Sequence, residues 1–221
     1  MAKRNDADDA ILVIGLGRFG SAIAVTLDDL GKNVLAVESN TSRAQNWSHR
    51  FRVVQADASS PEALDQIGAH AFNIAVVGVG TSLEASVLIT ANLVDAGVPE
   101  IWAKATSRKH GTILKRIGAN HVVYPENDAG QRVAHMLSGK MLDYIEMEDQ
   151  FTIVKMIPPK ELVGFTLAQS NVTQKYGIRI IGVKSPGQPF EYANRDTKIG
   201  QGDVIIVSGD PNLLEQFANH S

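Results

Sequence analysis

The sequence predicts an α/β chain in two lobes, a doubly wound parallel sheet followed by a small α+β lobe. Short apolar runs alternate with amphipathic stretches through the first half of the chain, as in repeated βαβ units. These runs are almost continuously apolar, which is typical of parallel strands covered on both faces. After Pro125 the rhythm changes to short strands separated by turns, and this change predicts the second lobe.

Six strands are expected in the first lobe, at Ile11–Ile14, Asn33–Val37, Arg52–Ala56, Asn73–Val77, Glu100–Ala105 and His121–Tyr124. Helix starts are expected between them. Ser60 followed by Pro61 predicts an N-cap with proline in the first helical turn. Thr81 with Glu84 predicts a capping box at the start of the next helix.

The second lobe is expected to be a short succession of strands and helices. One more helix, Asn127–Leu137, precedes it, and polar Ser138–Lys140 is expected to loosen the chain. Its strands are expected at Phe151–Ile157, Ile178–Lys184 and Val204–Ser208, with helices at Leu167–Lys175 and after Pro211. We therefore expect a first domain over 9–126, a crossover helix and linker over 127–144, and a C-terminal domain over 145–221.

The composition excludes several kinds of site and partner. The chain of 221 residues has no cysteine, which excludes disulfides, thiolate metal sites and cysteine nucleophiles. A net charge of −3 argues against a nucleic-acid partner. The charged N-terminus differs from a signal peptide, and no apolar run is long enough to span a bilayer. The lack of cysteine fits a reducing cytoplasm, and if the protein acts at a membrane we expect it to do so through a partner.

A glycine-rich loop, Gly15-Leu16-Gly17-Arg18-Phe19-Gly20, follows the first expected strand and opens a helix. It has the GxGxxG spacing of a Rossmann dinucleotide-binding turn. Gly15 permits the tight turn, Gly17 lets the backbone approach a pyrophosphate, and Gly20 lets the helix pack close to the strand. The first lobe is therefore expected to be a Rossmann-type domain that binds an adenine nucleotide by its phosphates. The alternative is a glycine-rich turn without a ligand.

Two acidic residues and one arginine extend this expectation. Glu38 ends the second strand, where a carboxylate accepts hydrogen bonds from ribose and repels a 2′-phosphate, favouring NAD or ATP over NADP. A solvated glutamate at the strand end is the alternative. Asp57 is placed to reach the adenine edge or to cap the next helix. Arg18 is suited to pair with a terminal phosphate, unless it points into solvent.

Three motifs together resemble a known family. The segment Val13–Gly20 resembles the opening of RCK proteins, the regulators of potassium conductance. A longer resemblance runs through Ile101-Trp102-Ala103-Lys104-Ala105, His110, Ile117-Gly118-Ala119, Val123-Tyr124-Pro125-Glu126 and Gly130. A third covers Asn171-Val172 and Lys175-Tyr176-Gly177. Their order is that of the TrkA-type gating subunits of Ktr/Trk bacterial potassium-uptake systems.

The resemblance implies an RCK N-lobe and an RCK C-lobe in a peripheral, cytoplasmic subunit on the inner face of the membrane. It further implies a dimer-based octameric ring beneath a membrane potassium transporter. Exchange of ATP, ADP or NAD(H) would change the shape of this ring and so gate the transporter. The chain is accordingly expected not to be an enzyme.

The resemblance also implies which residues hold the nucleotide: Gly15, Gly17, Arg18, Phe19, Gly20, Glu38, Asn40, Asp57, Ala58, Gly78, Lys104 and Glu126. The loop residues would hold the phosphates, Glu38 and Asn40 would lie at the ribose, and Asp57 and Ala58 would lie at the adenine. Lys104 would lie near the phosphates.

Two further ligands are implied by the resemblance. Glu126 would help to coordinate Mg²⁺ or Ca²⁺ beside the phosphates, and a glutamate that only favours the helix dipole is the alternative. Relatives that bind cyclic di-AMP between paired C-lobes carry an arginine after Asn-Val, where this chain has Thr173. The phosphate contact would then have to come from another residue, such as Lys175 or Arg179.

Two other functions compete with this interpretation. An NAD-dependent oxidoreductase would need a substrate domain and a catalytic acid or base near the nicotinamide, and the small second lobe offers no candidate. A redox-sensing repressor would need a helix-turn-helix with a basic recognition helix, which the sequence does not contain.

Overall fold

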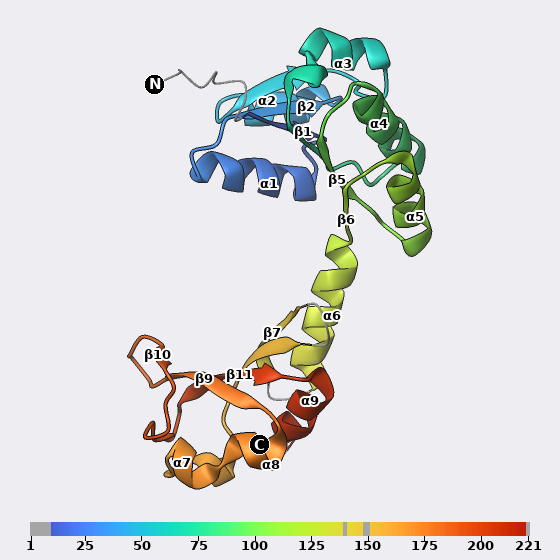
Figure 1. Ribbon diagram of the computed structural model, residues 1–221. Helices are drawn as coiled ribbons and strands as arrows, with labels where there is room; N and C mark the ends of the chain where they lie inside the picture. The colour runs from blue at the N-terminus through green and yellow to red at the C-terminus, as the bar shows by residue number, and fades with distance from the viewer. Residues whose placement is uncertain (1–9, 139–140, 148–150, 220–221) are drawn as a thin grey trace, which may run out of the picture. The chain divides into compact units, whose positions relative to one another are not determined.

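The computed structural model of the chain describes residues 10–138, 141–147 and 151–219. These residues form two compact units, and the chain passes from the first to the second between Glu126 and Asn127 (Figure 1). Each unit has its own sheet and its own hydrophobic core. None of the helices within these ranges is both long enough and apolar enough to cross a membrane.

The first unit contains a six-stranded sheet in the order β3-β2-β1-β4-β5-β6. Its strands are β1 (Ile11–Ile14), β2 (Val34–Glu38), β3 (Arg52–Gln55), β4 (Ile74–Val77), β5 (Glu100–Lys104) and β6 (His121–Val123). All neighbouring pairs are parallel. This confirms the expected Rossmann-type sheet, in which chain order reverses between β1 and β4. Ligands of such sheets bind at the carboxyl ends of the strands beside that switch point.

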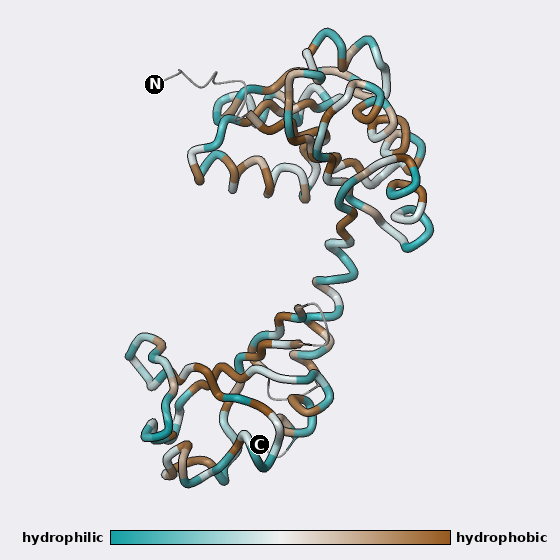
Figure 2. The backbone as a smooth tube through the Cα atoms, in the orientation of Figure 1, coloured by the Kyte–Doolittle hydropathy of each residue, from teal (hydrophilic) through white to brown (hydrophobic). Residues whose placement is uncertain are grey.

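Helices cover both faces of this sheet (Figure 1). They are α1 (Arg18–Asp29), α2 (Thr41–Trp47), α3 (Pro61–Ile67), the short 3-10 helix η1 (Ala69–Ala71), α4 (Leu83–Asp95) and α5 (Arg108–Ile117). Side chains alternate across a strand, so Leu12 and Ile14 pack into one core layer and Val13 into the other. Figure 2 accordingly shows hydrophobic residues along the central strands.

The helix starts follow the cap residues closely. The Ser60 side chain accepts a hydrogen bond from the Ala63 backbone, and Pro61 begins α3, as the sequence predicts. The prediction for α4 is wrong by one residue. Ser82, not Thr81, is its N-cap and accepts from the backbone N–H of Ala85. A cap hydroxyl must reach the N–H three residues ahead, so the helix start at Leu83 selects Ser82 from two adjacent hydroxyl residues.

The second unit is an antiparallel five-stranded sheet with short helices, which confirms the α+β lobe. The sheet order is β10-β9-β11-β8-β7. The strands are β7 (Met141–Glu146), β8 (Thr152–Met156), β9 (Arg179–Lys184), β10 (Glu191–Tyr192) and β11 (Val204–Gly209). The helices are α6 (Pro125–Ser138), the 3-10 helix η2 (Lys160–Leu162), α7 (Leu167–Ser170), α8 (Val172–Tyr176) and α9 (Pro211–Asn219). Helix α6 begins at the last two residues of the first unit.

Three elements of this lobe differ from the prediction. Residues 141–144, expected in a linker, belong to β7, which pairs with β8 at the sheet edge and carries a bulge between Met141 and Asp143. Strand β10 was not expected. The single helix expected over Leu167–Lys175 is two helices, because Asn171 between them adopts a left-handed conformation with φ 47°. The expected loosening at Ser138–Lys140 falls mostly on residues outside the described ranges.

Candidate functional site

The loop between β1 and α1 is built around its glycines. Gly15 has φ +88°, a left-handed conformation that side chains rarely adopt. A Cβ on Gly20 would lie 1.9 Å from the Gly15 carbonyl oxygen, so only glycine allows the helix to approach the loop this closely. Gly17 is the N-cap of α1 and faces open space, with nothing within 4 Å of the position its Cβ would take.

The N-terminus of α1 is left open by this arrangement. Gly17 provides no side-chain cap, and the first turn of α1 contains no acidic residue. The first N–H groups of a helix have no partner within the helix and carry the positive end of its dipole. They can therefore hold a phosphate group.

A cavity opens beside this loop, at the carboxyl ends of β1, β2 and β4. Half of the predicted nucleotide residues line it: Gly15, Gly17, Glu38, Asp57, Ala58 and Gly78. Gly78 also packs on the loop, since a Cβ there would lie 2.9 Å from the Gly15 carbonyl oxygen. The cavity thus stands at the switch point, where the topology predicts a ligand.

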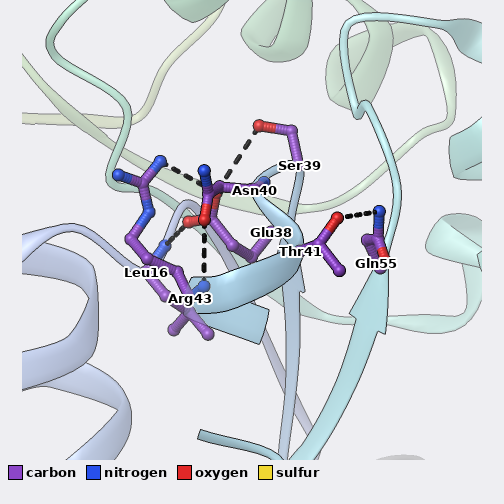
Figure 3. A network of polar contacts seen from close by, with 7 residues as sticks. All are labelled: Leu16, Glu38, Ser39, Asn40, Thr41, Arg43 and Gln55. Atoms are coloured by element: carbon purple, nitrogen blue, oxygen red, sulfur yellow. Dashed lines mark hydrogen bonds and ion pairs between the residues drawn. The ribbon is translucent and has the colours of Figure 1, made fainter. Parts of the chain in front are cut away.

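Glu38 lies in the cavity wall as a buried carboxylate that accepts several hydrogen bonds (Figure 3). Its side chain is 3% exposed. Its Oε2 accepts from the Leu16 backbone N–H at 2.7 Å, and its Oε1 accepts from the Asn40 backbone N–H at 2.8 Å and from Arg43 Nη2 at 3.1 Å. Burial alone would raise the pKa of Glu38, but the hydrogen bonds from Arg43, Asn40 and Leu16 hold that pKa below its usual value. The alternative of a solvated glutamate is therefore wrong.

Asn40 and Arg43 connect this carboxylate to the start of α2. Asn40 is the N-cap of α2, and its side chain accepts from the backbone N–H of Arg43 at 3.0 Å. Asn40 is therefore beside Glu38 but does not line the cavity. Arg43 does line the cavity, and the sequence analysis did not identify it. The sequence feature that could have identified Arg43 is a basic residue in the first turn of the helix that follows the acidic strand end.

Asp57 lines the cavity and also stabilises the turn that follows β3. Its Oδ1 accepts from the Ser59 backbone N–H at 3.0 Å and from the Ser59 hydroxyl at 2.7 Å, and these bonds lower the pKa of Asp57. The N-cap of α3 is Ser60, so Asp57 is not the helix cap. The neighbouring Ala58 is buried in the wall of the same cavity.

A second group of predicted residues gathers outside the cavity wall, around Lys104. The Lys104 Nζ lies 2.5 Å from Glu126 Oε1 and 5.8 Å from the centre of the Phe19 ring. The hydrogen bond from Lys104 lowers the pKa of Glu126, with a smaller contribution from the charge of Arg18. Two cations and one anion thus leave a net positive charge beside the loop.

Few side chains around Lys104 and Glu126 could act as ligands of a divalent cation. Glu126 is 61% exposed and already paired with Lys104. Across the residues that the structure describes, no group of three or more histidine, aspartate and glutamate side chains could hold a metal ion. Glu126 could supply one ligand, and the others would have to be phosphate oxygens and water, which is an ordinary way to bind Mg²⁺.

The second unit carries a groove of its own next to α7 and α8. Thr173 and Arg179 line it together with Arg195. Lys175 does not: its Nζ lies 3.2 Å from Glu161 and above the Tyr176 ring. Of the two residues considered as substitutes for the missing arginine, only Arg179 faces the groove.

Comparison with known proteins covers both units. Residues 11–125 match the TrkA-N domain family, and residues 151–220 match the TrkA-C domain family. Ktr system potassium uptake protein A of Bacillus subtilis (strain 168) is 32% identical over 209 residues, which cover 94% of this chain and 94% of that protein. Ktr system potassium uptake protein C of the same organism is 32% identical over 207 residues, covering 93% of this chain and 94% of that protein.

Solved structures agree with this assignment at the level of the fold. The GsuK RCK domain has a TM-score of 0.68 at 19% identity, covering 97% of this chain and 48% of its own. The GsuK channel bound to NAD has a TM-score of 0.65 at 19% identity, covering 96% of this chain and 39% of its own. The resemblance to TrkA-type RCK proteins is confirmed. The chain belongs to the family of proteins in which a TrkA-N domain is followed by a TrkA-C domain.

Proposed function

We propose that this protein is a nucleotide-sensing regulatory subunit of a membrane potassium-uptake system. The observation that carries the proposal is the open glycine-loop cavity at the switch point of the first unit. It occurs in a chain that a relative named for potassium uptake matches along 94% of its length. The GsuK channel of similar fold was solved with NAD bound.

The ligand of this proposal is an adenine nucleotide, ADP or ATP, with NAD(H) as the other candidate. Its phosphates would meet the N-terminus of α1, where Arg18 and Lys104 add positive charge. Its ribose would meet Glu38, and its adenine would lie toward Asp57 and Ala58. Mg²⁺ or Ca²⁺ would join through Glu126 when ATP is bound.

The carboxylates of the cavity are suited to accept hydrogen bonds from a nucleotide. The carboxyl groups that line it belong to Glu38 and Asp57, and the pKa of each lies below its usual value. Both are therefore ionised and hydrogen-bonded at neutral pH, which suits them as acceptors and not as proton donors. In this proposal the nucleotide is a signal and not a substrate.

The same proposal includes assembly and location. A sensor needs two states to which its ligand binds unequally, because equal affinity shifts nothing. The family resemblance suggests that these states are shapes of a dimer-based octameric ring, held at the inner face of the membrane by the potassium transporter. If cyclic di-AMP also binds, Arg179 would supply the phosphate contact that Thr173 lacks.

Potassium flux tests the proposal directly. The partner transporter is reconstituted in vesicles with and without this protein, and flux is measured with ATP, ADP, NADH or no nucleotide. We expect flux to depend on the protein and to differ between nucleotides. Flux that is indifferent to the protein, or steady hydride transfer from NADH to a small substrate, would contradict the proposal.

A further inference from the structure

The pairing between Glu38 and Arg43 raises a question about how a ribose could bind. A carboxylate has about four lone-pair positions. On Glu38, Oε1 already accepts from Asn40, from Arg43 and, at 3.5 Å, from the Ser39 hydroxyl, and Oε2 accepts from Leu16. One position on Oε2 is left. A ribose that donates from both its 2′- and 3′-hydroxyl groups needs two.

These four donors differ in how easily they can leave, and the Ser39 hydroxyl makes the longest contact at 3.5 Å. The N–H groups of Leu16 and Asn40 belong to the backbone of the glycine loop and of the α2 N-cap, and they are fixed by the fold. Arg43 reaches Glu38 with a side chain that is 54% exposed. Water can hydrate this guanidinium once it leaves Glu38, so its release costs little. Arg43 is therefore the charged donor that gives way, and the long contact from the Ser39 hydroxyl opposes a ribose only weakly.

We propose that Arg43 competes with the ribose hydroxyl groups for Glu38 and thereby sets which ribose the site accepts. The inference rests on the proposed function, since it assumes that a nucleotide binds in this cavity. An unsubstituted ribose displaces the guanidinium from Oε1. A ribose that carries a 2′-phosphate instead meets the guanidinium as a partner, because an arginine beside this strand end can accommodate that group.

Glu38 and Arg43 therefore act in opposite directions on the same choice. The buried Glu38 carboxylate favours binding of a free ribose and opposes binding of a 2′-phosphate. Arg43 opposes binding of a free ribose and favours binding of a 2′-phosphate. The carboxylate is fixed and shielded from water, and the guanidinium is screened by solvent. The wild-type site should thus still bind NADH more tightly than NADPH. The ratio of the two affinities should be smaller than it would be with Glu38 and without Arg43.

Binding measurements on the full chain separate these effects. Arg43→Ala is compared with wild type and with Arg52→Ala, which removes the same charge at the exposed start of β3, outside the cavity. We expect Arg43→Ala to bind ADP about two- to fivefold more tightly, the range of a weak ion pair whose arginine is exposed to solvent. It should bind 2′,3′-dideoxy-ADP as the wild type does. The ratio of NADH to NADPH affinity should rise, and Arg52→Ala should change none of these values.

Each other outcome has a definite meaning. Weaker ADP binding by Arg43→Ala, or equal tightening for ADP and the dideoxy analogue, would overturn the competition. An unchanged or lower NADH-to-NADPH ratio would overturn the part that concerns the 2′-phosphate. Wild-type protein that binds neither ADP nor NADH would instead contradict the proposed function. A thermal melt of each variant confirms that the changes do not reflect unfolding.

Discussion

Two glycines in one loop should fail in different ways when each is replaced by alanine. A Cβ on Gly20 would lie 1.9 Å from the Gly15 carbonyl oxygen, and backbone atoms cannot move aside as a side chain can. A Cβ on Gly17 would meet nothing within 4 Å, and φ at Gly17 is −67°, which alanine adopts freely. Gly20→Ala should therefore destabilise the fold, whereas Gly17→Ala should only fill the space in which we place the pyrophosphate.

The magnitudes follow from these contacts. Gly20→Ala should lower the free energy of unfolding by about 3 kcal/mol, the upper end of ordinary overpacking. For Gly17→Ala two small effects oppose each other: alanine is a poorer N-cap, and it also reduces the entropy of the unfolded chain. The net change in unfolding free energy should stay within about 1 kcal/mol. Its affinity for ADP should nevertheless fall at least tenfold, because the methyl group occupies the position of the ligand.

Urea unfolding and calorimetric titration with ADP measure the two quantities on the same samples. A Gly20→Ala protein as stable as wild type would show that helix α1 does not approach the loop as closely as described. A Gly17→Ala protein that binds ADP as tightly as wild type would show that the pyrophosphate does not bind at this loop. The pair is its own control, since both variants make the same chemical change three residues apart in the sequence.

Three further predictions concern single charged or titratable groups. Arg18→Ala should weaken ATP binding about tenfold more than ADP binding if Arg18 meets the terminal phosphate, and equal weakening in a titration would contradict this. Glu126→Gln should reduce the dependence of ATP affinity on Mg²⁺; an unchanged dependence would favour the role of Glu126 at the helix dipole. Burial lowers the pKa of His110. The unfolded chain therefore takes up a proton below about pH 6.5 that the folded chain does not, and stability falls as the pH drops through that range. Urea unfolding of His110→Gln, with exposed His49→Gln as control, should show a smaller loss between pH 7 and 5.5, and an equal loss would refute it.

The parts of the site that could be predicted from sequence are those in which the local backbone conformation permits only one residue type. Gly15 and Gly20 are needed wherever a strand turns sharply into a closely packed helix, so their spacing indicates both the turn and the phosphate site. Glu38 was predictable because the end of the second strand of a Rossmann sheet faces the ribose. These positions are fixed by topology.

The parts that could not be predicted depend on contacts whose geometry appears only after folding. Arg43 returns to Glu38 because α2 begins at Thr41, and that start is set by the Asn40 cap. The break at Asn171 and the edge strand β7 depend likewise on one left-handed residue and on pairing with a neighbouring strand. Neither leaves a periodic pattern in the sequence.

The ion pair between Lys104 and Glu126 beside the loop suggests how a bound nucleotide would act on the rest of the chain. The charge of Lys104 is satisfied by Glu126, with only 12% of the lysine side chain exposed. A phosphate near Arg18 would draw on the same ammonium group and release the Glu126 carboxylate, which could then bind a cation held by that phosphate. Glu126 lies in the first turn of α6, the helix that continues into the second unit. A ligand with one phosphate more or fewer would therefore bind this pair unequally. That difference in affinity is what a sensor requires in order to shift between two states.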